Sequence, residues 1–282
     1  MNILIKKSFA NSLTVLNLML GFIAIILISL SMTGFNYINL ACQMIFFAAL
    51  IDVFDGKIAR KLGTSGNFGK EIDSLADLVS FCVAPSYLIF FYCYDLMNIN
   101  LVLLIIISSS TLIFGAIRLA RFNAYPEQSD NSYYIGLPTP ANAILICSLV
   151  LYMFNMPFND LTELMSFFNS DVSTDFFIFR WINYPLSIFL SYNEYMLVGI
   201  YLFSSILLIS KIKYSKFPVL NLKVNIINTL SLIGLGIFFI VLIVSIFLNK
   251  YHIVLLFFVL SYILGGIINH FYKGLISLKN KG

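Results

Sequence analysis

The stretch that decides the fold is Asp52-Val53-Phe54-Asp55-Gly56-Lys57-Ile58-Ala59-Arg60, followed after a short polar turn by Gly69-Lys70-Glu71-Ile72-Asp73-Ser74-Leu75-Ala76-Asp77. Helical periodicity over residues 37–62 gathers five of these positions on one face: Asp52, Asp55, Gly56, Ala59 and Arg60. The same periodicity stacks three more on one stripe of the next helix: Gly69, Asp73 and Asp77. We therefore expect two helices, joined by residues 63–68, that turn these stripes toward each other.

The four aspartates predict a cation site. Carboxylates that converge in a low-dielectric setting need countercharge, because burying unpaired charge is costly. Oxygen ligands without a nearby His or Cys favour a hard ion such as Mg²⁺ or Mn²⁺, one or two of them. Gly56 and Ala59 leave room for a phosphorylated group, and Arg60 can bind phosphate oxygens. The alternative is that these charges merely mark the cytoplasmic ends of two membrane helices.

The spacing D-x2-D-G-x2-A-R-x8-G-x3-D-x3-D resembles the signature of the CDP-alcohol phosphotransferases, with every fixed position filled. The resemblance implies that two divalent ions are held by the aspartates: Asp52, Asp55, Asp73 and Asp77. It also implies that CDP-diacylglycerol is bound by the small residues and the arginine: Gly56, Ala59, Arg60 and Gly69. Asp77 takes the position of the family's general base.

Three further stretches resemble the membrane-embedded bacterial phosphatidylserine synthases of that family: residues 73–85, 118–123 and 136–141. The resemblance covers residues 10–210 and implies transfer of a phosphatidyl group to L-serine with release of CMP. Arg118, Arg121 and Asn123 are candidates to bind the serine carboxylate or a substrate phosphate. Alternatively, the arginines are topological anchors on lipid phosphate.

Two other functions stay open. One is the same reaction with a different acceptor, glycerol 3-phosphate or an inositol phosphate, which predicts a more basic acceptor pocket. The other is a cation transporter that uses the intramembrane carboxylates as its site.

Composition indicates an integral membrane protein. With 60% hydrophobic and 11% charged residues, the chain has too little polar surface to cover a soluble globule. Its basic residues are dispersed along loops, so no nucleic-acid partner is expected. The four cysteines lie in apolar runs without metal-type spacing and are interpreted as packing residues.

Hydropathy predicts an all-α bundle of about eight transmembrane helices. The expected spans are 13–31, 37–56, 74–94, 100–120, 137–156, 186–210, 226–248 and 252–272. With both termini in the cytoplasm, fifteen of the 17 Lys and Arg residues fall on the cytoplasmic side, and only Arg180 and Lys250 fall outside. This topology places the motif at the cytoplasmic face of the inner membrane.

The chain divides into a motif-bearing membrane domain, 1–210, and a terminal helix pair, 226–272, separated by a hinge around Pro218. The domain has six spans and an external loop, 157–185. At its start, Asn11 and Thr14 are candidates to cap the first span, and Asn17 is a candidate to face the nucleotide. The family resemblance further implies a homodimer.

Overall fold

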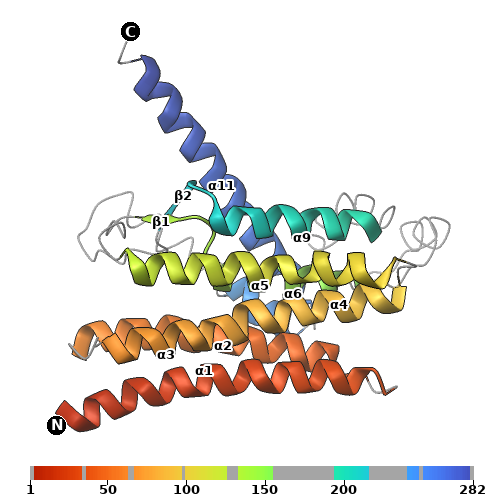
Figure 1. The fold of residues 1–282 in the computed structure, drawn as a ribbon, viewed down its shortest axis with the longest axis horizontal. Coiled ribbons are helices and arrows are strands. Elements are labelled where there is room, and N and C mark those ends of the chain that lie inside the picture. Colours follow the sequence, from red (N-terminus) through yellow and green to blue (C-terminus); the bar gives the residue numbers. More distant parts are fainter. Residues whose placement is uncertain are drawn as a thin grey trace.

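The protein is an α-helical membrane bundle (Figure 1). A computed structural model describes residues 3–33, 36–62, 67–96, 99–125, 133–154, 194–215, 240–247 and 250–279. The elements in chain order are α1 (Ile3–Ser31), α2 (Ile38–Leu62), α3 (Asn67–Asp77), the π-helical segment η1 (Leu78–Val83), α4 (Ala84–Leu96), α5 (Leu101–Ala124), β1 (Tyr133–Ile135), α6 (Thr139–Phe154), α9 (Glu194–Ile209), β2 (Lys213–Ser215) and α11 (Tyr251–Lys279).

Five helical stretches are long and apolar enough to cross a membrane: 12–31, 38–56, 68–94, 101–124 and 251–273. α6 and α9 are shorter apolar helices, and residues 240–247 are also helical. The polytopic helical class predicted from hydropathy is therefore confirmed. Eight spans stay a prediction, because residues 186–193 of one expected span, residues 226–239 of another and all of the loop 157–185 lie outside the described residues.

Helix α1 begins earlier than predicted. We expected the first span to start at Leu13, but the helix already runs from Ile3. Thr14 therefore lies inside a helix and cannot cap its first turn. By contrast, α5 starts where expected, because the Asn100 side chain accepts a hydrogen bond from the Val102 amide at 2.9 Å.

The third membrane stretch is a single helical rod made of α3, η1 and α4. Its middle part, η1, is wound as a π-helix and starts directly after Asp77. Such wide turns are rare and often lie at functional sites. Two glycines of neighbouring helices make room for this segment. A Cβ at Gly21 of α1 would lie 2.6 Å from the Ser80 Cα. A Cβ at Gly115 of α5 would collide with Cys82. Close helix approach at glycines is typical of membrane bundles.

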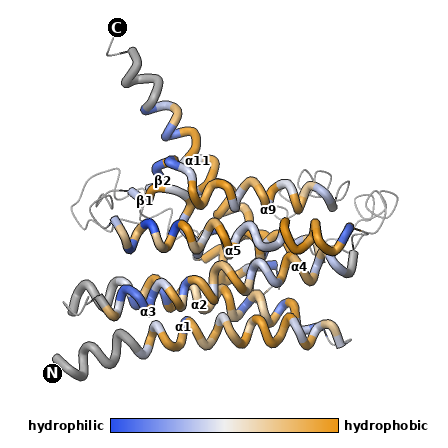
Figure 2. The backbone as a smooth tube through the Cα atoms, in the orientation of Figure 1, coloured by the Kyte–Doolittle hydropathy of each residue, from blue (hydrophilic) through white to orange (hydrophobic). Residues whose placement is uncertain are grey.

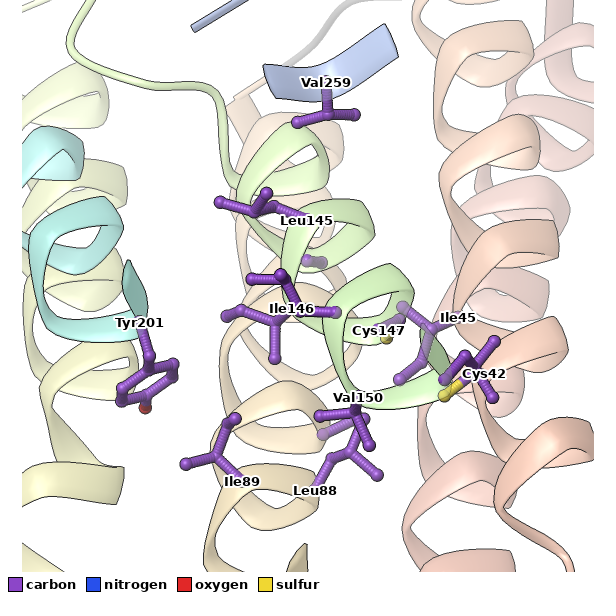
Figure 3. Packing of buried hydrophobic residues seen from close by; sticks show 14 of the residues in the cluster. Cys42, Ile45, Leu88, Ile89, Leu145, Ile146, Cys147, Val150, Tyr201 and Val259 are labelled. Atoms are coloured by element: carbon purple, nitrogen blue, oxygen red, sulfur yellow. The ribbon is translucent and has the colours of Figure 1, made fainter. Parts of the chain in front are cut away.

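Helix α6 lies at the centre of the core. Eleven of its residues are buried. Figure 3 shows Cys147 of α6 on the side of Cys42 of α2, and Val150 of α6 next to Leu88 of α4. All four cysteines are buried and unbridged, as expected for packing residues.

The sequence did not predict the two short strands. β1 and β2 pair antiparallel, with Tyr134 opposite Tyr214, and so join the segment before α6 to the segment after α9. Gly136 follows β1 with φ 77°, and its amide donates to the Ile212 carbonyl at 2.8 Å. This left-handed conformation suits glycine. In Figure 1 the strands lie at the same end of the bundle as α3, and Figure 2 shows hydrophilic stretches at that end.

Candidate functional site

Three aspartates from two helices converge at this end of the bundle. Asp52 of α2 and Asp73 and Asp77 of α3 each offer a carboxylate oxygen, and these oxygens lie within 4.8 Å of one another. Asp73 and Asp77 share a helix face because they are four residues apart. We call this group the acidic cluster. The acidic faces of α2 and α3 thus meet, as predicted from helical periodicity. Three negative charges at this separation require a countercharge.

The fourth aspartate of the motif, Asp55, is not in the acidic cluster. It lies one turn after Asp52 on α2 and is 5% exposed. Its Oδ2 accepts a hydrogen bond from the Thr14 hydroxyl of α1. Asp55 nevertheless interacts electrostatically with both Asp52 and Asp73, so it is a close neighbour of the cluster.

Helix α1 holds two of the motif's carboxylates. Thr14 contacts Asp55, and Asn17, one turn later, donates from Nδ2 to Asp77 Oδ1 at 3.3 Å. The other amide atom, Asn17 Oδ1, is buried without a hydrogen-bond partner. The sequence pattern had suggested a cap for Thr14 and the nucleotide for Asn17. The sequence did contain a clue to these contacts. Thr14 and Asn17 are polar residues three positions apart in an apolar span, and such residues usually face the bundle interior.

The π-helical segment fixes the position of Asp77. The hydroxyl of Ser80, three residues after Asp77, donates to the Asn17 carbonyl at 2.9 Å. The contact is close because Gly21 has no side chain. The backbones of α1 and η1 are therefore locked together beside the Asn17–Asp77 hydrogen bond.

Arg118 supplies positive charge next to the acidic cluster. It is 6% exposed in α5 and interacts electrostatically with Asp52 and Asp77. Its guanidinium carbon lies 4.7 Å from the centre of the Phe122 ring. Its Nε is buried without a hydrogen-bond partner. Arg118 thus stands where it can bind an anion beside the aspartates.

The other two predicted acceptor residues contact protein groups. Arg121 donates from Nη1 to the Ile209 carbonyl at 3.3 Å and from Nη2 to the Ile135 carbonyl at 3.2 Å. Asn123 donates from Nδ2 to Ser74 Oγ at 3.0 Å and to a Glu71 carboxylate oxygen at 3.2 Å. These contacts tie α5 to α9, β1 and α3. The role of both residues in binding serine or phosphate stays a prediction.

The residues predicted to bind the nucleotide-linked lipid are described only in part. Gly56 is exposed on α2, and a Cβ there would meet nothing within 4 Å. Gly69 is half-buried in the first turn of α3. α2 continues through the positions of Ala59 and Arg60, but their side chains lie outside the described residues.

The donor set fits a hard divalent cation. All three ligands of the acidic cluster are carboxylates, and the unpartnered oxygen of Asn17 adds a neutral oxygen beside Asp77. No His or Cys belongs to the cluster within the described part of the chain. The site can thus hold a metal ion between α2 and α3, with α1 and α5 on either side.

Comparison with known proteins agrees with this geometry. The model of the CDP-alcohol phosphatidyltransferase family matches residues 7–189. A CDP-diacylglycerol–serine O-phosphatidyltransferase of Helicobacter pylori is 39% identical over 144 residues, which are 51% of this chain and 57% of the relative.

Two archaeal proteins are similar over nearly the same share of the chain. A CDP-diacylglycerol–serine O-phosphatidyltransferase of Methanocaldococcus jannaschii is 38% identical over 149 residues, covering 51% of this chain and 62% of the relative. An archaetidylserine synthase of Methanothermobacter thermautotrophicus is 38% identical over 141 residues, covering 49% and 56%. The matched part spans less than two thirds of each of these relatives.

Proposed function

The chain belongs to the CDP-alcohol phosphatidyltransferase family, and from this premise we propose that it transfers the phosphatidyl group of CDP-diacylglycerol to the hydroxyl of L-serine, giving phosphatidylserine and CMP. The observation that carries the proposal is the acidic cluster with Arg118 beside it. Carboxylates that hold a divalent ion, next to a buried guanidinium, suit a phosphoryl transfer from a pyrophosphate. The names of the relatives support serine as the acceptor.

The aspartates would hold the metal. Asp52, Asp73 and Asp77, with Asp55 close by, are the proposed ligands of two Mg²⁺ or Mn²⁺ ions. When bound, such ions polarise the phosphoryl oxygens and neutralise the leaving group. Thr14 and Asn17 hold two of these carboxylates in place, so α1 preorganises the site before substrate arrives.

Asp77 is the proposed general base. It accepts the proton of the serine hydroxyl while the serine oxygen forms a bond to the phosphorus that carries diacylglycerol. The bond between that phosphorus and the bridging oxygen breaks, and CMP leaves with the electron pair. The hydrogen bond from Asn17 orients the Asp77 carboxylate for this proton transfer.

The remaining motif residues would bind the substrates. CDP-diacylglycerol would lie against Gly56 and Ala59, with Arg60 on its phosphates and Gly69 allowing close approach. The open space at Gly56 supports this placement. Arg118, Arg121 and Asn123 are proposed for the acceptor side, and the buried Arg118 has the strongest support because its Nε lacks a partner.

We also propose the membrane arrangement. The protein has eight spans with both termini in the cytoplasm, and the acidic cluster faces the cytoplasm at the inner membrane. Residues 1–210 form the catalytic domain, and 226–272 form a terminal helix pair. The distribution of Lys and Arg supports this orientation. Labelling of single cysteines introduced at each end tests it.

A homodimer is proposed from family membership alone. Light scattering of the purified protein in detergent tests it, and a monomer mass would exclude a stable dimer under those conditions.

CMP release tests the function. Purified protein with CDP-diacylglycerol, L-serine and Mn²⁺ or Mg²⁺ should release CMP, and Asp77→Asn should abolish the release. Glu71→Gln is the matched control, because it removes an exposed negative charge of the same helix outside the acidic cluster and keeps a side-chain oxygen that can accept the hydrogen bond from Asn123. Preference for glycerol 3-phosphate or an inositol phosphate in a side-by-side panel would overturn the serine assignment. Metal flux into proteoliposomes without CMP release would indicate a transporter.

A further inference from the structure

Four buried polar atoms of α5 and α6 have no hydrogen-bond partner. They are Arg118 Nε, Thr139 Oγ1 and both amide atoms of Asn142. The three side chains are 6%, 1% and 0% exposed, respectively. Buried polar groups are nearly always hydrogen-bonded, because desolvation without a partner is costly. Where such atoms lie on helices beside a proposed active site, they point to a polar ligand that the protein binds.

Two of the three residues, Arg118 and Thr139, are linked through one packing point. A Cβ at Gly115 would lie 3.9 Å from Thr139 Cγ2 and would collide with Cys82. Arg118 is one turn after Gly115 on α5. Cys82 interacts electrostatically with both Asp77 and Arg118, so this packing point lies next to the proposed base.

Asn142 is one turn into α6 from Thr139. Helix α6 starts beside the end of α5, since Arg121 near that end donates to the carbonyl of Ile135 just before α6. It therefore leads back into the bundle, opposite to the direction of α5. Helical side chains lean toward the start of their own helix. The Arg118 guanidinium lies over the Phe122 ring and interacts electrostatically with Asp77 and Cys82, so it stands between the end of α5 and this packing point. On α6, Asn142 leans toward the level of Thr139.

We propose that Arg118, Thr139 and Asn142 form the acceptor site and bind a zwitterionic amino acid, with the guanidinium on its carboxylate and the amide and hydroxyl oxygens on its ammonium group. This assignment rests on the proposed function and adds two residues of α6 to it. The amino-acid hydroxyl then points toward Asp77.

The chemistry of the three side chains selects this ligand class. Arg118 offers donors only, whereas the Asn142 amide and the Thr139 hydroxyl each offer a donor and an acceptor. The carboxylate of an amino acid needs hydrogen-bond donors and its ammonium group needs acceptors, so a site for it must supply both. A phosphorylated acceptor such as glycerol 3-phosphate has no ammonium group and favours several cations. The second arginine, Arg121, already donates to two backbone carbonyls.

Steady-state kinetics of three α6 variants tests the proposal. Asn142→Leu and Thr139→Val keep the side-chain size and remove the polar atoms. We expect each to raise the KM for L-serine on the order of ten-fold or more, as for loss of a hydrogen bond to a charged group. The KM for CDP-diacylglycerol should change less than about two-fold. Ser148→Ala is the matched control, because its buried Oγ also lacks a partner on the same helix. It should leave both constants unchanged.

Thermal unfolding without substrate separates binding from folding. Replacing an unpartnered buried amide with an apolar side chain should leave the midpoint unchanged or raise it. A lowered midpoint in Asn142→Leu, or an unchanged KM for serine in both variants, overturns the acceptor site while the proposed function stands. If the unmodified protein releases CMP with another acceptor and not with L-serine, both are overturned.

Discussion

Substituting alanine for Gly21 is a sharp test of how the acidic cluster is held. The added Cβ would lie 2.6 Å from the Ser80 Cα, whereas ordinary van der Waals contact begins at 3.4 Å, so α1 and η1 must separate by roughly 0.8 Å. The neighbouring atom is backbone and cannot rotate away. We expect a loss of about 1–3 kcal/mol in stability, as for other overpacked cores.

The separation also moves Asn17 away from Asp77, because both flank the contact. Misplacement of a catalytic group by about 1 Å can cost on the order of 100-fold in rate. We therefore expect Gly21→Ala to lower the rate of CMP release at saturating substrates about 10- to 100-fold, and to lower the thermal midpoint.

The matched control is Gly199→Ala on α9, where an added Cβ meets nothing within 4 Å. It should preserve activity and stabilise the helix by about 0.5–1 kcal/mol. A second control is the pair Gly21→Ala with Ser80→Ala, which should stay impaired because the added methyl group still clashes with the backbone of residue 80. Full activity of Gly21→Ala, or rescue by Ser80→Ala, would refute this backbone clash as the reason.

Three further outcomes are expected. Thr14→Val removes the hydroxyl that donates to Asp55 and keeps the shape, so CMP release should fall about ten-fold with little change in thermal midpoint; unchanged turnover would show that this hydrogen bond is dispensable. Chelation with EDTA should abolish CMP release, and added Mn²⁺ or Mg²⁺ should restore it, whereas activity that survives exhaustive chelation would exclude a metal role for the acidic cluster. Asn100→Ala removes the cap of α5 and should cost about 1 kcal/mol in thermal unfolding while activity is kept, and an unchanged midpoint would contradict the cap.

Local sequence patterns predicted the acidic cluster well. Asp73 and Asp77 share a face because four residues make about one helical turn, and Asp52 was placed on the facing stripe of α2 by the same rule. The three carboxylates meet as expected. Asp55 lies close to the group and accepts a hydrogen bond from Thr14, and its role as a metal ligand stays a prediction. Periodicity fixes the face of a residue and cannot tell which neighbouring helix that residue will contact.

The supports of the site were missed for a related reason. Thr14 and Asn17 reach aspartates 41 and 60 residues further along the chain, and Ser80 reaches back 63 residues to Asn17. Such interactions depend on how closely helices approach, and no local pattern encodes that distance. Arg118 and Arg121 illustrate the same point, because they look equivalent in sequence but only Arg118 lies beside the acidic cluster.

The sequence by itself determined the membrane class, the two acidic stripes and their oxygen-only chemistry, because hydropathy and the helical repeat act over a few neighbouring residues. Only the tertiary structure decided that α1 would hold the carboxylates, that glycines at 21 and 115 would let η1 pack against its neighbours, and that Thr139 and Asn142 would be buried without partners. These features arise where separate helices meet, and the fit between helices is set by the whole packed bundle.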